Sequence, residues 1–126
     1  MESITEKYLN YYKNTTNLKV YPREWLIRAL LGPGLKSYIP SNLKGLKVLD
    51  ISFGDCRNLG ILNDLGMYVF GTEISDDIVE LGNKTCSKHN ISAELKTGWN
   101  DSIPFSDAFF DVAISSSSAY YVRQDI

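Results

Sequence analysis

The sequence predicts an α/β domain with a mostly parallel β-sheet, in which strands alternate with helices. Short apolar runs such as Val48 to Ile51 have the length of buried strands. Segments with apolar residues three and four positions apart separate these runs, as expected of amphipathic helices. Elements that alternate in this rhythm form βαβ units, which give parallel pairing and right-handed crossovers.

Residues 1–45 are expected to form an N-terminal helical cap followed by a loop. The first 20 residues are polar with scattered tyrosines, which indicates a helix and then a loop. A second helix is expected to begin at Tyr21-Pro22-Arg23-Glu24, because proline suits the first helical position and glutamate the first turn. Gly32-Pro33-Gly34 should end this helix, and a loop follows to about Gly45.

Residues 46–126 are expected to form the core of the domain. A helix over residues 58–65 places leucines on one face and is followed by Gly66. Another helix begins after Ser75, a favourable N-cap residue, and carries apolar residues at Ile78 and Leu81. The expected strands cover residues 46–51, 67–74, 91–97 and 109–115.

Composition excludes several classes of function. A length of 126 residues suits one domain, and a net charge of −2 without a basic stripe argues against a nucleic-acid partner. No apolar run reaches the roughly 18 residues of a membrane span, and the start lacks the apolar core of a signal peptide. We therefore expect a cytoplasmic protein with a small-molecule substrate. Cys56 and Cys86 are too few and too unpatterned for a disulfide framework or a metal site.

Three strand ends mark the expected ligand site, because open parallel sheets bind ligands beyond the carboxyl ends of their strands. They are the turn after Ile51, the end of the second strand at Glu73, and the end of the fourth strand at Ser115. A carboxylate at Glu73 can accept hydrogen bonds from both hydroxyls of a ribose. The alternative is an acid that is merely solvated at the end of its strand.

The turn after the first strand does not match the dinucleotide fingerprint G-x-G-x-x-G. That motif needs glycines at 52, 54 and 57, where this chain has Ser52, Gly54 and Arg57. Asp50 and Asp55 bracket the turn and would repel a diphosphate at the helix N-terminus. This pattern disfavours NAD and ATP and favours a nucleoside with an amine and a sulfonium, provided that Arg57 turns outward to solvent.

The segments VLDISFGD, GTEIS and IPFSDAFFDVAIS resemble three successive motifs of the class I S-adenosylmethionine-dependent methyltransferases. The resemblance covers roughly residues 21–126, in the family's order and spacing. It implies a Rossmann-like sheet with helices on both faces, S-adenosylmethionine as cofactor and S-adenosylhomocysteine as product. The family's sheet has seven strands, so this chain resembles the N-terminal portion only, with about four strands.

The resemblance implies that the turn after the first strand holds the methionine part of the cofactor. Asp50 would lie under it and orient the turn and the ammonium group. Ser52, Gly54 and Cys56 occupy the family's three glycine positions, and Gly54 would let the backbone approach the ligand. Ser52 and Cys56 are expected to avoid positive φ, where a side chain costs about 1 kcal/mol or more. Phe53 should point into the packing of the sheet.

The resemblance also implies contacts with the nucleoside and with the transferred methyl group. Glu73 would bind the ribose hydroxyls, and Ile74 would pack on the adenine. Ser115 would face the cofactor near the reacting sulfur, and Tyr21 belongs to a helix similar to the family's cap over the cofactor. The adenine amine is expected to meet one of three adjacent residues, namely Trp99, Asn100 or Asp101.

The leading hypothesis is a methyltransferase of a small polar metabolite or a sugar. Such catalysis rests on positioning because the cofactor carries the reactive methyl group, so no catalytic residue is assigned. One alternative is a non-catalytic Rossmann-like binding or scaffold domain, which the missing glycines favour. Another is an NAD-dependent oxidoreductase, which Arg57 and the two aspartates disfavour. The open edge of a partial sheet is expected to cause self-association.

Overall fold

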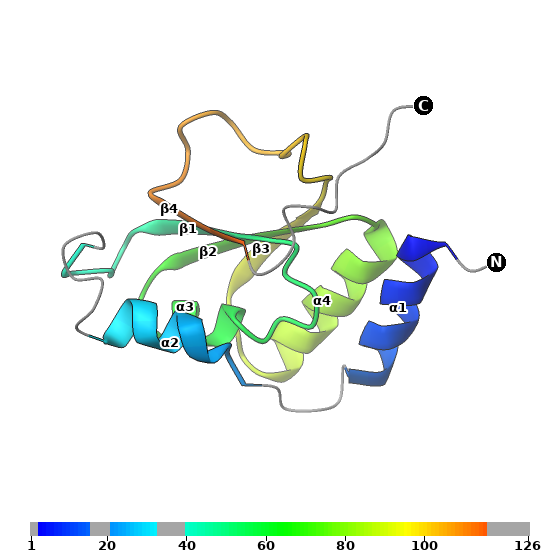
Figure 1. Cartoon of the computed structure of the whole chain (residues 1–126), viewed down its shortest axis with the longest axis horizontal. Coiled ribbons are helices and arrows are strands. Elements are labelled where there is room, and N and C mark those ends of the chain that lie inside the picture. Colours follow the sequence, from blue (N-terminus) through cyan, green and yellow to red (C-terminus); the bar gives the residue numbers. More distant parts are fainter. Residues whose placement is uncertain (1–2, 16–20, 33–39, 116–126) are drawn as a thin grey trace.

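The computed structural model describes residues 3–15, 21–32 and 40–115, and it contains one parallel sheet in the strand order β3-β2-β1-β4 (Figure 1). The prediction of a Rossmann-like, mostly parallel sheet is confirmed. The strands are β1 (Lys47–Ile51), β2 (Tyr68–Glu73), β3 (Ala93–Thr97) and β4 (Val112–Ser115). The helices are α1 (Ile4–Thr15), α2 (Glu24–Leu31), α3 (Leu59–Asp64) and α4 (Asp76–Lys88).

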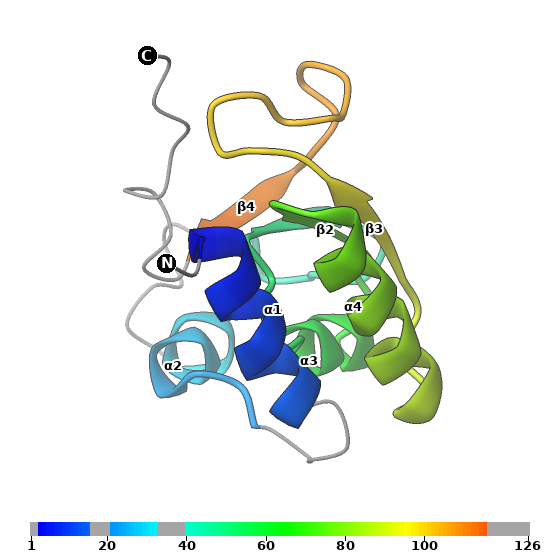
Figure 2. The same cartoon turned by 90° about the vertical axis from the view of Figure 1, so that its right-hand side faces the viewer.

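The described helices lie on one face of the sheet, and the connection from β3 to β4 runs over the other (Figures 1 and 2). The chain moves from β1 to β2 to β3 in one direction and then returns to the opposite side of β1. Right-handed crossovers therefore place the last connection on the opposite face from α3 and α4. The reversal lies between β1 and β4, and ligands bind at such a switch point in open α/β sheets.

An aromatic cluster covers part of the sheet face opposite the described helices. The ring of Phe70 on β2 lies 5.2–5.6 Å from the rings of Phe105, Phe109 and Phe110, which belong to the β3–β4 connection. The perpendicular orientations are those preferred by aromatic pairs. The connection is thereby held against the sheet.

Two strands, β3 and β4, begin at least two residues later than the sequence suggests, and hydrogen bonds give the reason. The N–H of Ile91 donates to the carbonyl of Cys86 at 2.8 Å, so Ile91 completes the end of α4 instead of pairing in β3. Phe109 and Phe110 belong to the aromatic cluster, and pairing with β1 starts beside Asp111. The Asp111 carboxylate accepts the Lys47 N–H at 2.8 Å, and the Asp111 N–H donates to the Lys47 carbonyl.

The predicted helix ends at Ser75 and Gly32 are confirmed. The helix α2, however, begins at Glu24, because Arg23 is extended and is its N-cap residue, so the expectation that Pro22 takes the first helical position is wrong. The Ser75 hydroxyl accepts the N–H of Ile78 at 3.2 Å and caps α4, whose first turn carries Asp76 and Asp77. The helix α2 ends at Leu31 before Gly32, while Pro33 and Gly34 lie outside the described residues. None of the helices in the described ranges is long and apolar enough to cross a membrane.

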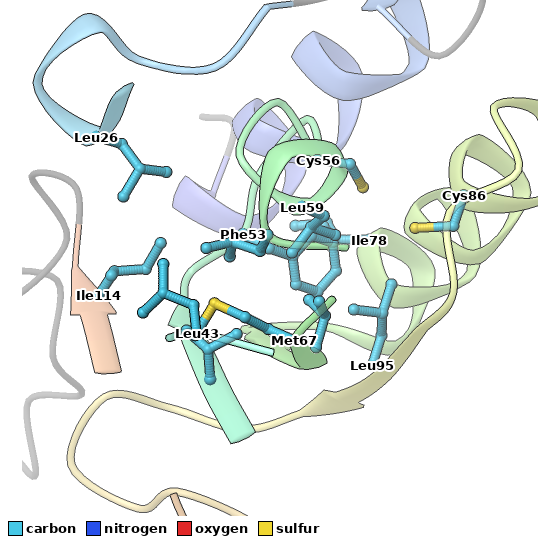
Figure 3. Close-up of a cluster of buried hydrophobic side chains, with 13 residues drawn as sticks. Leu26, Leu43, Phe53, Cys56, Leu59, Met67, Ile78, Cys86, Leu95 and Ile114 are labelled. Atoms are coloured by element: carbon cyan, nitrogen blue, oxygen red, sulfur yellow. The ribbon is translucent and has the colours of Figure 1, made fainter. Parts of the chain in front are cut away.

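The core lies between the sheet and the helices, and Phe53 occupies its centre (Figure 3). The Phe53 side chain is 3% exposed, so the prediction that it points into the packing is confirmed. A Cβ placed at Gly82 would lie 2.6 Å from Phe53 Cε1, and one at Gly71 would lie 2.9 Å from Phe53 Cδ2. These two glycines leave the space that the ring fills.

The substitution Gly82→Ala is expected to lower the free energy of unfolding by about 1–3 kcal/mol, because the added methyl group overlaps Phe53 in a packed core. Denaturant unfolding followed by circular dichroism measures this change. The matched control is Gly60→Ala in α3, where the nearest atom to an added Cβ is Ile91 Cδ1 at 3.7 Å. This control should be neutral or stabilising by up to about 1 kcal/mol. Equal effects at the two positions would contradict the packing argument.

Candidate functional site

The turn between β1 and α3 adopts a left-handed backbone at all three positions where the resemblance places glycine. The φ angles are 59° at Ser52, 59° at Gly54 and 66° at Cys56. The expectation that Ser52 and Cys56 avoid positive φ is therefore wrong. The chain must turn sharply from the strand into the helix, and local contacts offset a conformational cost of roughly 1–2 kcal/mol per residue.

The side chains of Ser52 and Cys56 make contacts outside the turn. Ser52 Oγ lies 3.1 Å from Asn100 Oδ1, to which it donates a hydrogen bond. Cys56 is 3% exposed, and its Sγ lies 3.8 Å from the carbonyl oxygen of Gly82. The two substituents are thus held by the β3–β4 connection and by α4.

Glu73 closes the turn from the end of β2. Its side chain accepts the N–H of Gly54 at 3.0 Å through Oε2 and the N–H of Ile74 at 2.9 Å through Oε1. The Phe53 N–H adds a hydrogen bond to the carbonyl of Thr72 at 3.1 Å. Burial raises the pKa of Glu73 above its ordinary value, and the two N–H donors partly oppose this shift.

Asp50 is a buried acid in β1 with one oxygen unsatisfied. Its side chain is 2% exposed, and Oδ2 has no hydrogen-bond partner among the described residues. Burial, with smaller contributions from the charges of Glu73 and Asp55, raises the pKa of Asp50 to about 8. The acid is therefore mainly protonated at neutral pH. A ligand that brings a positive charge or a hydrogen-bond donor could pair with its unsatisfied oxygen.

Asp55 and Arg57 form an ion pair within the turn. Arg57 Nη2 lies 2.7 Å from Asp55 Oδ2, and Arg57 Nε lies 3.1 Å from Asp55 Oδ1. The expectation that Arg57 turns outward to solvent is wrong, because its guanidinium folds back onto the carboxylate. The charge of Asp55 is compensated locally, so Asp55 adds less negative potential to the turn than the sequence suggested.

A tyrosine of α1 lies directly on the turn, and no role was predicted for it. A Cβ placed at Gly54 would lie 2.9 Å from Tyr12 Oη and 3.2 Å from Tyr12 Cζ. Burial and the charges of Glu73 and Asp55 raise the pKa of Tyr12. Its ring also stacks on Tyr8 with a centroid distance of 5.9 Å. Tyrosines four positions apart share one helix face, which is the signal that could have identified this residue.

The segment after β3 lies beside the end of β2. The N–H of Gly98 donates to the backbone carbonyl of Glu73 at 2.8 Å, and a turn follows in which the Ser102 N–H donates to the Trp99 carbonyl. Together with the bond from Ser52 to Asn100, this places the Trp99–Asp101 segment near both Glu73 and the turn. The segment thus has the position expected of it, while its contact with a ligand stays a prediction.

Ser115 lies beside the turn, whereas Tyr21 lies just before α2. Ser115 pairs in register with Ile51, so β4 brings it next to the residue that precedes the turn. Tyr21 is 69% exposed and precedes α2, whose start is tied to α3 by a bond from the Arg23 N–H to Asn58 Oδ1 at 2.9 Å. The role of Tyr21 at the cofactor stays a prediction.

Comparison with known proteins identifies the family. A family model described as a methyltransferase domain matches residues 48–126, which is more than half of the chain. The chain belongs to this methyltransferase domain family. The matched range begins within β1 and includes the turn, Glu73 and the Trp99–Asp101 segment. A comparison with curated proteins gives no significant match.

Solved structures resemble this methyltransferase domain over part of their length. The PH0226 protein of Pyrococcus horikoshii is 27% identical, with a TM-score of 0.57 over 82% of this chain and 49% of that chain. A SAM-dependent methyltransferase of Aquifex aeolicus is 16% identical, with a TM-score of 0.62 over 85% and 55%. A TehB-like SAM-dependent methyltransferase of Corynebacterium glutamicum is 23% identical, with a TM-score of 0.57 over 89% and 54%. The chain spans about half the length of each.

The substitution Asp50→Asn is expected to flatten the dependence of stability on pH. Between the ordinary pKa of 3.8 and the folded value of about 8, the folded protein holds a proton that the unfolded chain has released. Asp50 therefore makes stability fall as pH rises through this window. The stability of the variant relative to the parent should therefore increase from pH 4 to pH 8 by more than about 1.4 kcal/mol, the equivalent of one pKa unit.

Denaturant unfolding at several pH values between 4 and 9 measures this effect. Asp107→Asn, which removes an exposed carboxylate of the β3–β4 connection, controls for the loss of one negative charge. A variant at Asp50 whose stability follows the same pH profile as the parent would show that this acid is ionised in the folded protein.

Proposed function

We propose that this methyltransferase domain binds S-adenosylmethionine in the turn between β1 and α3 and serves methyl transfer to a small polar metabolite or a sugar. The observation that carries the proposal is the left-handed turn at Ser52, Gly54 and Cys56, closed by the Glu73 carboxylate. Membership in the methyltransferase domain family supports it. So do the names of the Aquifex and Corynebacterium neighbours, which are SAM-dependent methyltransferases.

The turn fits the methionine part of the cofactor. Gly54 carries no side chain, and Tyr12 fills the space that a side chain would take, so a ligand that approaches the Gly54 backbone on this side would also meet Tyr12. The unsatisfied Oδ2 of Asp50 lies buried beside the turn, and a cationic ammonium group nearby would favour release of its proton. Asp50 would then be an anion that is paired, and the cost of its burial would fall.

The edge formed by the ends of β2 and β3 fits the nucleoside. Glu73 has two carboxylate oxygens, and each accepts one backbone N–H, which leaves further acceptor capacity for ribose hydroxyls. Ile74 follows Glu73 and is half-buried, so it can pack against the adenine. One of Trp99, Asn100 and Asp101 would meet the adenine amine.

The residues of this chain contribute to transfer by positioning. When bound, S-adenosylmethionine supplies the methyl group on its sulfonium, and S-adenosylhomocysteine is the product. Ser115, at the end of β4 beside Ile51, would lie near the sulfur. An excess of acidic over basic residues, 15 against 13, supports a small polar substrate over a nucleic acid. Because the chain spans about half of its neighbours, the activity is proposed for the whole protein.

A non-catalytic binding or scaffold domain of the same fold is the second candidate. Side chains at Ser52 and Cys56, where the resemblance places glycine, are the observation that favours it. The contacts of these side chains with Asn100 and Gly82 weigh against it, because they turn the substituents to neighbouring segments. The backbone of the turn keeps the shape of a glycine turn.

Isothermal titration with S-adenosylmethionine and S-adenosylhomocysteine tests the proposal, and saturable binding of both is expected. The substitution Glu73→Gln should weaken binding by roughly 1–3 kcal/mol, because an amide accepts fewer hydrogen bonds than a carboxylate.

Glu94→Gln is the matched control for this titration, since Glu94 is exposed on β3 and changes the net charge equally. No heat with either ligand at millimolar concentration would favour the scaffold domain. Binding that Glu73→Gln leaves unchanged would show that the ribose lies elsewhere.

Tyr12 is proposed to contact the bound cofactor, and Tyr12→Phe removes its hydroxyl while keeping the ring on Gly54. Affinity for S-adenosylmethionine should fall by about 1 kcal/mol, the usual net contribution of one hydrogen bond. Tyr11→Phe on the same helix is the control, because Tyr11 is 53% exposed. If Tyr12→Phe binds more tightly than the parent, the tyrosine competes with the cofactor.

A further inference from the structure

The two cysteines, which are 30 positions apart in the sequence (86 − 56), meet beside the turn. Both are free, and their side chains are 3% and 4% exposed. Figure 3 shows the sulfur of Cys56 and the sulfur of Cys86 pointing toward one another across the gap between the turn and α4. Cys86 lies one helical turn after Gly82, whose carbonyl oxygen is 3.8 Å from Cys56 Sγ.

We propose that Cys56 and Cys86 form a reversible disulfide that ties the turn to α4 under oxidising conditions. The backbone at Cys56 supports this assignment. A residue other than glycine is strained at a φ of 66°. The fold nevertheless holds Cys56 in this conformation, in which its thiol points toward the thiol of Cys86 (Figure 3). The disulfide needs the two sulfurs at about 2.05 Å from each other, so the turn or α4 must shift to form it.

The two thiols differ in reactivity, and the difference gives the order of the steps. The Cys56 thiol has one hydrogen and two acceptors within reach, the Gly82 carbonyl and the Cys86 sulfur. A hydrogen bond from Cys56 lowers the pKa of Cys86, and the same hydrogen bond, with burial, raises the pKa of Cys56. Cys86 is therefore the better thiolate, which is the form that reacts with oxidants.

The oxidant must be small, because both sulfurs are buried, and hydrogen peroxide meets this requirement. The Cys86 thiolate attacks one peroxide oxygen, the O–O bond breaks, and a sulfenic acid and hydroxide form. The Cys56 thiol then attacks the Cys86 sulfur, the S–O bond breaks, and its proton leaves with the departing oxygen as water. Two thiols and one peroxide thus give one disulfide and two waters.

Treatment of the folded protein with hydrogen peroxide tests the disulfide directly. The expected result is the loss of two hydrogen atoms in the intact mass. Non-reducing tryptic digestion should then link the peptide Val48–Arg57 to the peptide Thr85–Lys88, and dithiothreitol should separate them. Cys86→Ser, a close match in size, should give no linked peptide under the same treatment.

The outcome that would overturn the disulfide is equally specific. If Cys86 is oxidised to sulfinic acid while Cys56 remains a thiol, the two sulfurs do not meet in the folded protein. The proposed disulfide is also overturned if the thiols stay reduced until guanidinium unfolds the chain, or if linked peptides come only from dimers. The mass loss and the linked peptides are measured on the unsubstituted protein, so the test does not depend on the folding of the Cys86→Ser variant.

A regulatory effect on the cofactor rests on the proposed function. A shift of the turn that brings the sulfurs together would move Cys56 relative to Gly54, whose N–H donates to Glu73. The oxidised protein should bind S-adenosylmethionine about tenfold more weakly, as expected for the loss of one hydrogen bond, and dithiothreitol should restore the affinity. A linked protein of unchanged affinity would overturn the regulation. No binding by the reduced protein would instead overturn the proposed function.

Discussion

The hydrogen bond from the Gly54 N–H to the Glu73 carboxylate joins the turn after β1 to the end of β2, and the site depends on it. A buried N–H without a partner would cost about 1–3 kcal/mol, so the carboxylate and the turn stabilise each other. With the turn held, Phe53 enters the space left by Gly71 and Gly82. The same geometry that shapes the candidate ligand site therefore also fills the centre of the core.

The charges around this hydrogen bond are balanced by different means. Asp55 is compensated by the guanidinium of Arg57, which is a strong pairing because two nitrogens face one carboxylate. Asp50 has no such partner and is kept mainly neutral by its raised pKa. Glu73 is buried as well, and two backbone N–H groups solvate it. The local charge of the site is thus smaller than the three acidic residues suggest.

The sequence predicted the architecture well because the relevant signals are local. The alternation of strands and helices gave the parallel sheet, and Ser75 marked the start of α4. The structure brings together some of the residues that the sequence placed at the site: Gly54 donates to Glu73, and the charge of Glu73 contributes to the raised pKa of Asp50. Their role in cofactor binding stays a prediction. Their meeting follows from the rule that parallel strand ends share one edge, which needs no knowledge of side-chain packing.

The features that the sequence did not reveal depend on contacts between distant segments or on side-chain conformation. Tyr12 reaches the turn only because α1 packs on the helical face, far from Gly54 in the sequence. The pairing of Arg57 with Asp55 is a choice of rotamer that composition does not fix. The strand β3 starts later than predicted because the Ile91 N–H donates to the Cys86 carbonyl at the end of α4.

Ser52 and Cys56 show why a missing glycine motif did not mean a missing turn. Glycine is common in such a turn because it adopts a left-handed backbone at the lowest conformational cost. The ligand, however, contacts the backbone of the turn, which other residues can also form. Here the cost at Ser52 is offset by its bond to Asn100, and Cys56 is held in the packing beside Gly82. Since both substituents are held by other segments, the surface formed by the Gly54 backbone keeps its shape. The conformation of the turn, more than its composition, is therefore what links this chain to cofactor binding.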